Sequence, residues 1–425
     1  MSLLETPEAQ ALLQEAVLEP SDVTACRRRL THFLKRYLPK FYRREQRDNA
    51  SVVVSGLLGD LERKTCEPIA RRAGLERKPI QFFVGSGKWD DEAVMAEVRE
   101  HVREERADPR GILIFDGSGF PKKGNASCGV QRQWCGRLGK IDNCQTAVFL
   151  AYATSLGYAP LDRRLYLPKD WAEDQARRKQ THVPPEVAFR AKWQIALEML
   201  SSQISKIPHA WITADDEFGR ISEFRAQLRQ RGESYVLDVP SNTWIRDLET
   251  PAPQGRARTG RPRSRPWQPV HAWLGKQAAQ NWKTFVIRNG TKGPLRVRAL
   301  TTRVQTRIES RVGEEERLIV FQTLESQPRT VFALSHAPVN TPLEELLRVA
   351  AARHRIEEMF EAAKGDAGLA HYEVRSWLGW HHHITLSFLA LWFLLLERTQ
   401  LGEKNPGDFS PANTPALCLS APQAN

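Results

Sequence analysis

The hydrophobic and polar positions divide the chain into three parts with different periods. Up to about Val102 the apolar residues recur at helical spacing, and from "GILIFDGSG" onward short apolar β runs alternate with helical segments. Between about Tyr235 and His336 the pattern is again that of strands: "SYVLDVPS", "KTFVIRNG", "LRVRALTTRV", "RLIVFQTLE" and "RTVFALSHAP". Strands with helices between them indicate an α/β sheet packed by helices rather than an all-β sandwich.

Two of the β runs are followed by acidic residues. The run "GILIFDGSG" is expected to stop at Asp116 and a glycine-rich turn, and "HAWITADDEFG" at Asp215 or Asp216. Taken singly, Asp116 is more simply explained as a turn residue, and either later acid as a helix N-cap. Taken together, they predict two carboxylates at the ends of two strands.

A long helix is expected late in the chain. Thr341 and Pro342 supply an N-cap and an N1 residue. The apolar period continues through "LEELLRVAAARHRIEEMFEAAK" and stops near Gly365 or Gly368.

This helix carries a charged stripe. At about 100° per residue, Glu357 and Lys364 fall within roughly 40° of Arg353, whereas Glu358 points about 100° further round. The stripe borders the apolar face, so it either lines a cleft or forms exposed salt bridges. From this helix alone, exposed salt bridges are the simpler explanation, because such pairs are common and weak. One detail points to a cleft, since Arg before Glu is the less favourable order for a surface pair.

Composition adds a preference for polyanions. Among 425 residues, 62 Lys and Arg face 50 Asp and Glu, giving a formal charge of +12, and nucleic acid is the first candidate partner. Basic residues cluster in "CRRRLTHFLKRYLPKFYRREQR" and in "PQGRARTGRPRSRPW", which is expected to be a mobile basic loop. An ordinary helical bundle with a solvated basic face explains the first cluster equally well.

Several classes of protein are disfavoured. The start "MSLLETPEAQ" has no secretion signal, so a cytoplasmic location is expected. The apolar run "ITLSFLALWFLLL" is shorter than the ~18 residues of a membrane span and predicts a buried helix. Six cysteines without a CxxC pair fit reduced thiols. The adjacent His381, His382 and His383 point about 100° apart on a helix, which favours structure or DNA contact over a metal site.

The three groups of acids together meet the needs of a two-metal phosphoryl-transfer centre. Carboxylate oxygens are suitable ligands for Mg²⁺ or Mn²⁺, and two ions about 3.5–4 Å apart clamp the attacking and leaving oxygens. No covalent nucleophile is then needed.

These residues resemble a known family. The order of Asp116 in "FDGSGFPKKG", Asp215 in "ADDEFG" and Glu357 in "RIEEMFEAAK" resembles the catalytic triad of bacterial DDE insertion-sequence transposases. The best match is the group with the signature Tyr-x2-Arg-x3-Glu-x6-Lys, whose spacing selects Arg353, Glu357 and Lys364, although Ala350 takes the place of the Tyr. The pieces "CGVQRQWCGRLGKIDNCQTAVFLAYAT" and "EVRSWLGWHHHITL" are similar to the branch described as DDE superfamily endonucleases, and the resemblance covers about residues 81–398.

The resemblance implies an α/β fold with an RNase-H-like catalytic core. The core is expected at 106–234 and 337–400, split by a β-rich insertion with a basic loop at 235–336. An all-helical DNA-binding region is expected at 1–105, and a polar, proline-rich, disordered tail at 401–425.

The resemblance also implies an activity: hydrolysis at transposon ends, followed by attack of the freed 3′-hydroxyl on target DNA. Two Mg²⁺ or Mn²⁺ ions would be held by the three acids, and phosphate oxygens by Arg353 and Lys364. Lys122 and Lys123 would assist, although a solvated turn is the simpler explanation for them. Contacts with the terminal repeats would come from the basic N-terminal residues, among them Arg28, Lys35, Arg43 and Arg44.

The expected partner is double-stranded DNA, both the terminal inverted repeats and the target, bound by a homodimer in the bacterial cytoplasm at the nucleoid. Two alternatives stay open. One is an RNase-H-like DNA-binding protein that no longer transposes, and the other is a metal-dependent nuclease without strand transfer.

Overall fold

The computed structural model describes residues 20–201, 204–255, 264–290, 293–308, 311–325 and 327–404. The start of the predicted N-terminal region, the centre of the predicted basic loop (256–263) and the predicted tail from residue 405 lie outside this range.

The first described part is helical, as the apolar period predicts. Its elements are α2 (Pro20–Tyr37), η2 (Leu38–Lys40), α3 (Arg44–Leu58), α4 (Cys66–Arg72), α5 (Arg77–Gly85) and α6 (Asp91–Arg106). The aromatic residues of the basic cluster turn inward at Phe33, Tyr37 and Phe41, whereas Tyr42 is 90 % exposed. One face of this cluster therefore builds the core, and the basic residues occupy the other.

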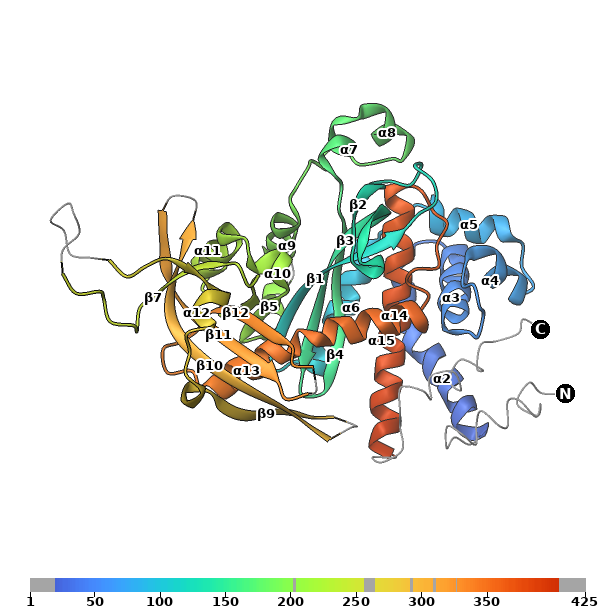
Figure 1. Ribbon diagram of the computed structural model, residues 1–425. Coiled ribbons are helices and arrows are strands. Elements are labelled where there is room, and N and C mark those ends of the chain that lie inside the picture. The colour runs from blue at the N-terminus through green and yellow to red at the C-terminus, as the bar shows by residue number, and fades with distance from the viewer. Residues whose placement is uncertain are drawn as a thin grey trace.

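Six strands form the centre of the sheet: β1 (Ile112–Pro121), β2 (Gln131–Cys135), β3 (Lys140–Thr154), β4 (Gly157–Leu165), β5 (Trp211–Ala214) and β6 (Tyr235–Asp238). The order along the sheet is β4–β3–β1–β5–β6, with β2 also pairing with β3. Strand β3 is antiparallel to both of its neighbours, β1 and β4, whereas β5 runs parallel to β1 and β6 parallel to β5. The α/β sheet inferred from the sequence is confirmed (Figure 1).

The prediction that the first strand stops at Asp116 is wrong. Strand β1 continues to Pro121, because β3 pairs with it along its whole length, from Ile112 opposite Ala153 to Pro121 opposite Cys144. On the other side, the parallel pairing with β5 ends at Phe115 opposite Ala214. Asp116 therefore lies inside β1 but just beyond the end of its parallel neighbour.

Short helices connect β4 to β6. They are α7 (Lys169–Glu173), α8 (Gln175–Gln180), α9 (Lys192–Ser201), α10 (Asp216–Gly219) and α11 (Ser222–Gln230). In Figure 1, α7 and α8 project from the end of the molecule near β2, while α9 to α11 lie beside β5.

The strands predicted between β6 and the late helix are present and extend the same sheet. They are β9 (Lys283–Gly290), β10 (Gly293–Ile308), β11 (Arg311–Thr323) and β12 (Thr330–His336), joined by the shorter β7 (Trp244–Asp247) and β8 (Gln268–Pro269) and by α12 (Val270–Leu274). Strand β12 pairs antiparallel with β6, so the insertion is hydrogen-bonded to the central sheet. Its far side has a small core of its own, centred on Ile245, Trp273 and Val304.

The single late helix predicted from the sequence is instead two helices, α13 (Leu343–Ala352) and α14 (His354–Gly365), which meet at Arg353. Arg353 keeps helical dihedral angles, but its N–H donates to Ala350 O and its carbonyl accepts from the Ile356 N–H, both three residues away. The turn is tightened there rather than broken. The start is also one residue later than predicted, with Pro342 rather than Thr341 as the N-cap.

Helix α15 (Trp377–Lys404) completes the core, and Figure 1 shows it standing between the N-terminal helices and the sheet. Its contacts reach α2, α3, α5, α6, α14 and β4. The apolar run Ile384–Leu395 is almost entirely buried, as predicted for a core helix. No helix among the described residues has the length and apolar character needed to cross a bilayer.

The three histidines of α15 are structural. His381 lies 2.9 Å from Trp377 O, His382 lies within 3.2 Å of Val84 O and Trp89 O, and His383 lies 3.0 Å from Gly368 O. Burial lowers the pKa of each to about 4. Their partners lie in three different places, so the interpretation as a structural rather than a metal-binding run is supported.

Candidate active site

Asp116 and Asp215 lie side by side on neighbouring strands. The last parallel pair of β1 and β5 is Phe115 and Ala214, and the two acids are the next residues on each strand. Asp116 Oδ1 accepts a 2.6 Å hydrogen bond from the Gly117 N–H, and Asp215 Oδ1 accepts one of 3.1 Å from the Glu217 N–H. Asp215 therefore acts as the N-cap of α10, which confirms the structural explanation of this residue and leaves its carboxylate beside Asp116.

A third acid stands at the same edge of the sheet. Strand β6 runs parallel to β5 and ends at Asp238, one strand further along than Asp215. Because the carboxyl ends of parallel strands meet at one edge, Asp215 and Asp238 share it. The sequence analysis did not single out Asp238, although its run "YVLD" closes on an acid just as the β5 run does.

Arg353 connects this edge to α14. Its Nε lies 3.0 Å from Asp238 Oδ2, and its Nη2 lies 2.7 Å from Glu357 Oε1. Glu357 is held a second time by His354, whose Nδ1 lies 2.7 Å from Glu357 Oε2. The guanidinium therefore sits between a sheet acid and a helix acid.

Burial and the charges of neighbouring side chains change the pKa values of these acids. Burial and then the charge of Asp215 raise the pKa of Asp116 well above its ordinary value. Burial, Glu217 and Asp216 raise the pKa of Asp215 to about 6, and burial raises that of Asp238 to about 7 although Arg353 opposes it. Burial also acts on Glu357, but Arg353 and His354 outweigh it and lower its pKa.

Lys364 reaches β1 from the same face of α14. Its Nζ donates a 2.9 Å hydrogen bond to Ser118 Oγ and lies over the rings of Phe120 and Phe360. Ser118 follows Asp116 by two residues and so shares its face of the strand. Burial, and then Arg137, lower the pKa of Lys364. Ser118 was not singled out from the sequence, although the alternation in "FDGSGF" indicates which positions accompany Asp116.

The neighbours of the two chosen acids point elsewhere. Asp216 pairs with Arg220 at 2.6 Å, and Glu358 pairs with Arg355 at 2.7 Å. Glu358 lines a separate cavity with Arg355, Asp366 and Arg398.

The carboxylates of these acids are chemically suitable ligands for a hard divalent cation. All of their donors are carboxylate oxygens, which Mg²⁺ and Mn²⁺ prefer, and the raised pKa values of Asp116 and Asp215 indicate a deficit of positive charge that a cation would relieve. In the part of the chain that the structure describes, no three His, Cys, Asp or Glu side chains are gathered closely enough to bind a metal ion. The carboxylate of Glu357 instead contacts the side chains of Arg353 and His354.

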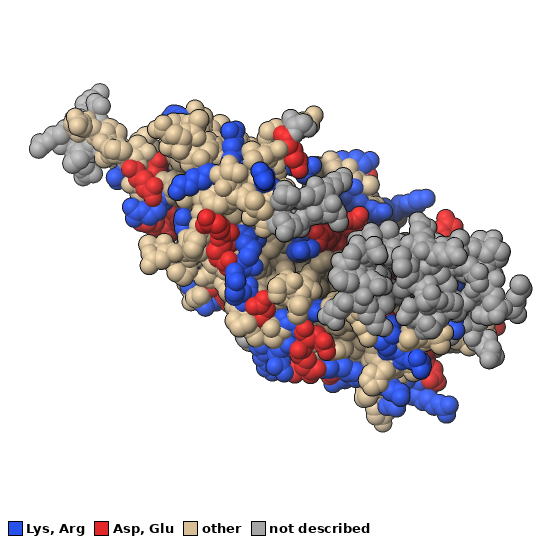
Figure 2. Space-filling view, turned by 90° about the horizontal axis from the view of Figure 1, so that it is seen from below, with Lys and Arg blue, Asp and Glu red and all other residues tan. Residues whose placement is uncertain are grey.

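The other basic residues selected from the sequence lie apart from the acids. The Lys122 ammonium lies 3.5 Å from the ring centre of Tyr372, and burial lowers its pKa to about 8, while Lys123 is exposed. In the N-terminal helices Arg28, Lys35, Arg43 and Arg44 are all exposed. Two of these are loosely paired, Arg43 with Glu45 at 3.4 Å and Arg44 with Asp48 at 3.9 Å. On the face shown in Figure 2, lysines and arginines are interspersed with acids.

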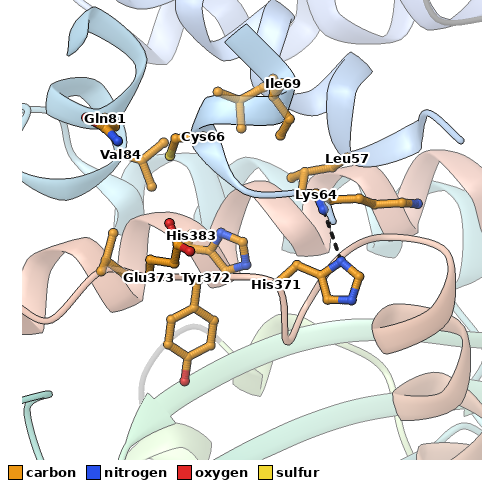
Figure 3. Close-up of a pocket in the computed structure, with 12 residues that line it drawn as sticks. Leu57, Lys64, Cys66, Ile69, Gln81, Val84, His371, Tyr372, Glu373 and His383 are labelled. Atoms are coloured by element: carbon orange, nitrogen blue, oxygen red, sulfur yellow. Dashed lines mark hydrogen bonds between the residues drawn. The ribbon is translucent and has the colours of Figure 1, made fainter. Parts of the chain in front are cut away.

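A small enclosed cavity lies elsewhere, between α3, α4, α5 and the segment before α15 (Figure 3). Its volume is about 190 Å³, and its wall is mostly apolar, with Leu57, Ile69 and Val84 facing Tyr372 and His383. None of the acids above lines it, so it has no part in their chemistry.

Comparison with known proteins gives two matches. The model of the family described as "DDE superfamily endonuclease" matches residues 36–296, well over half of the chain, and this stretch contains Asp116 and Asp215. A "Probable transposase for insertion sequence element IS701" from Microchaete diplosiphon is 30% identical over 198 residues, which are 45% of this chain and 49% of that protein. The chain thus spans about half the length of this curated relative.

Proposed function

Since this chain belongs to the family of DDE superfamily endonucleases, we propose that it is a DNA transposase, which cuts DNA at the ends of an insertion sequence and joins the freed 3′-hydroxyl to target DNA. One observation carries the proposal. Asp116 and Asp215 directly follow the last parallel pair of β1 and β5, while Arg353 at the start of α14 contacts Asp238 of the adjacent β6 and Lys364 on α14 contacts Ser118 of β1.

Asp116, Asp215 and Glu357 would hold two Mg²⁺ or Mn²⁺ ions. When bound, such ions activate a water or hydroxyl nucleophile and stabilise the leaving oxygen. The chain itself would supply two half-buried carboxylates at neighbouring strand positions, Asp116 and Asp215, and these would fix the direction from which a phosphodiester is approached. To serve as a ligand, Glu357 would exchange its contacts with Arg353 and His354 for the metal.

Arg353 and Lys364 would bind the oxygens of the scissile phosphate. The planar guanidinium offers a fork of donors, and the Lys364 ammonium offers a point charge on the other side of Asp116. The partial burial of Lys364 favours this role, because a cation shielded from water attracts an anion more strongly.

The partner would be double-stranded DNA, the terminal inverted repeats and the target, bound by a homodimer at the bacterial nucleoid. DNA as the partner is supported by the similarity to a probable transposase, by the net charge of +12 and by the exposed arginines and lysines of α2 and α3. Lys123, which is exposed just after the end of β1, would add a contact with the DNA backbone away from the acids.

One experiment separates the proposal from its alternatives. Purified protein is incubated with end DNA, target DNA and Mg²⁺, and the products are resolved on a gel. A joined product supports transposition, a cut product without joining indicates a nuclease, and a shifted band alone indicates a DNA-binding protein. The chelator EDTA and the variant Asp116→Asn are the controls, and both are expected to remove the joined and cut products but not the shifted band.

A further inference from the structure

We infer that Asp238 is a positioning residue of this active site, which anchors Arg353 to the sheet so that the guanidinium stays beside the acids when Glu357 leaves it. The part of the inference that concerns phosphate binding by Arg353 rests on the proposed function. The anchoring itself is a property of the fold.

The first support is the geometry of the ion pair. Asp238 Oδ2 forms an ion pair with Arg353 Nε at 3.0 Å, and the two side chains are only 17 % and 24 % exposed. The other oxygen, Oδ1, is buried and has no hydrogen-bond partner among the residues that the structure describes. A buried carboxylate with an unsatisfied oxygen costs stability, so its retention at this position indicates a task other than packing.

The second support is that the backbone of Asp238 is held from both sides. A Cβ added to Gly219, the last residue of α10, would lie 1.9 Å from the Asp238 carbonyl oxygen. Helix α10, which Asp215 caps, thus packs directly on the end of β6. On the opposite side, Asp238 pairs with Ala333 of β12. The anchor is therefore part of the rigid sheet and is fixed relative to Asp215.

The third support is the way Arg353 divides its donors. The contact with Asp238 is made by Nε, and the contact with Glu357 is made by Nη2, so the two acids meet different edges of the guanidinium. Glu357 contacts Arg353 and would also be a ligand of the proposed metal site. In a protein without Asp238, Arg353 would lose its contact with Glu357 whenever Glu357 bound a metal ion, and the contact with the sheet would be missing as well. With Asp238 in place, Nε stays anchored, and Nη2 becomes available to a phosphate.

The first test is a double-mutant cycle on cleavage of end DNA with Mg²⁺. We expect Asp238→Ala to slow cleavage by about 10- to 100-fold, as is usual when a group that orients a functional side chain is removed. In an Arg353→Ala background the same substitution should cost less than about 2-fold. Equal losses in both backgrounds would overturn the inference. Asp216→Asn, a nearby acid paired only with Arg220, is the matched control and should stay within about 2-fold of the wild type.

The second test needs no activity. Protein labelled with ¹⁵N-arginine is observed by NMR without metal, and the Nε–H signal of Arg353 is identified by its loss in Arg353→Lys. Asp238→Asn should shift this signal strongly and speed its exchange with water, while Glu357→Gln should leave its exchange slow. An unchanged signal in Asp238→Asn would refute the anchor. If the wild type cuts no DNA, the proposed function fails, and the NMR result still decides the anchor.

A third measurement excludes the rival that Asp238 is itself a metal ligand. Calorimetric titration of Mn²⁺ into Arg353→Ala and into the Asp238→Asn, Arg353→Ala double variant should give dissociation constants within about 2-fold of each other. A weakening of about 10-fold or more on removing the Asp238 charge would make Asp238 a ligand and overturn the positioning role.

Discussion

Glu357 is contacted by two basic side chains at once, Arg353 through one carboxylate oxygen and His354 through the other. These contacts lower the pKa of Glu357, while the pKa values of Asp116 and Asp215 are raised. The helix acid is thus directly paired with its basic neighbours, whereas at the two strand acids burial outweighs the attraction of Arg353. Binding of a cation at the strand acids would oppose this effect of burial.

The choice between neighbouring acids can be tested by substitution. Asp215→Asn and Glu357→Gln should each reduce Mg²⁺-dependent cleavage by at least about 100-fold, because each withdraws a charge that the ions need. DNA binding, measured by band shift, should be unchanged.

The matched controls are Asp216→Asn and Glu358→Gln, whose side chains pair with Arg220 and Arg355 outside the site. Both should keep most of the activity. If a control variant lost cleavage while the variant at the adjacent acid kept it, the control residue would be the true ligand and the choice between the two adjacent acids would be wrong.

The raised pKa of Asp215 predicts a pH effect with a definite sign. A carboxyl group whose pKa is about 6 in the folded protein and near 3.8 in the unfolded chain stabilises the fold at low pH. This stabilisation is lost as the pH rises through about 6. In EDTA, the thermal midpoint of the wild type should therefore fall relative to that of Asp215→Asn between pH 4 and pH 7.

Addition of Mg²⁺ at pH 7 should raise the midpoint of the wild type more than that of the variant, since a cation that binds the folded state stabilises it. Parallel midpoint curves for the two proteins across this pH range would show that Asp215 is ionised like an exposed acid.

The resemblance to the family signature selected Asp116, Asp215, Arg353, Glu357 and Lys364, and their catalytic roles stay a prediction. In the structure, Asp116 and Asp215 are adjacent, Arg353 contacts Glu357, and Lys364 contacts Ser118, two residues after Asp116. Periodicity alone could not select Asp238. Its relevance depends on β6 lying next to β5, a contact between residues 20 or more positions apart that no local pattern records.

Secondary-structure elements show where local patterns were insufficient. The glycines after Asp116 suggested a turn, yet β1 continues because β3 offers it a full row of hydrogen-bond partners. Those glycines have a packing role instead, since a Cβ at Gly119 would lie 2.9 Å from the sulfur of Cys135. Likewise, the tightened turn at Arg353 divides one apolar period into α13 and α14 without changing which residues face inward.

The contact between α10 and β6 leads to a prediction about stability and cleavage. Gly219→Ala should lower the free energy of unfolding by roughly 1–3 kcal/mol, because the added methyl group meets the backbone of Asp238 and neither can move freely. Cleavage should fall as well, since α10 carries Asp215. Urea unfolding and a cleavage assay measure the two effects.

Gly365→Ala is the matched control, because a Cβ there at the end of α14 meets nothing within 4 Å. Its unfolding free energy should change by less than about 0.5 kcal/mol. An equally mild result at Gly219 would mean that α10 can move away from β6.

In the whole molecule, the regions that differ in hydrophobic period along the sequence share one hydrophobic core. The buried residues of α2 to α6, of the central sheet and of α13 to α15 form one continuous core. A change of period therefore marks a change of secondary structure and not the limit of an independent folding unit, because tertiary contacts from α15 reach both sides of it.

The basic helices give a prediction about salt. Each phosphate that is neutralised contributes about −0.9 to the slope of log K against log salt concentration. Replacing Arg28, Lys35, Arg43 and Arg44 with Gln should therefore flatten the slope for DNA binding by up to about 3.6, measured by fluorescence anisotropy.

Four exposed basic residues around α7 and α8 form the control set: Lys169, Arg177, Lys179 and Arg190. Their replacement removes the same charge and should leave the slope nearly unchanged. An equal effect in both sets would assign the result to net charge rather than to a binding surface on α2 and α3.

The position of α15 has a consequence for how the protein is made. This helix packs on α2, α3, α5 and α6, yet the ribosome synthesises it after everything that it covers. At about 5–20 residues per second, tens of seconds pass between the synthesis of α2 and that of α15. During this time the apolar faces of the first helices have no cover and are exposed to chaperones and to aggregation. A chain interrupted before Trp377 lacks the helix that contacts both the N-terminal helices and the sheet, so translation itself delays the completion of the fold.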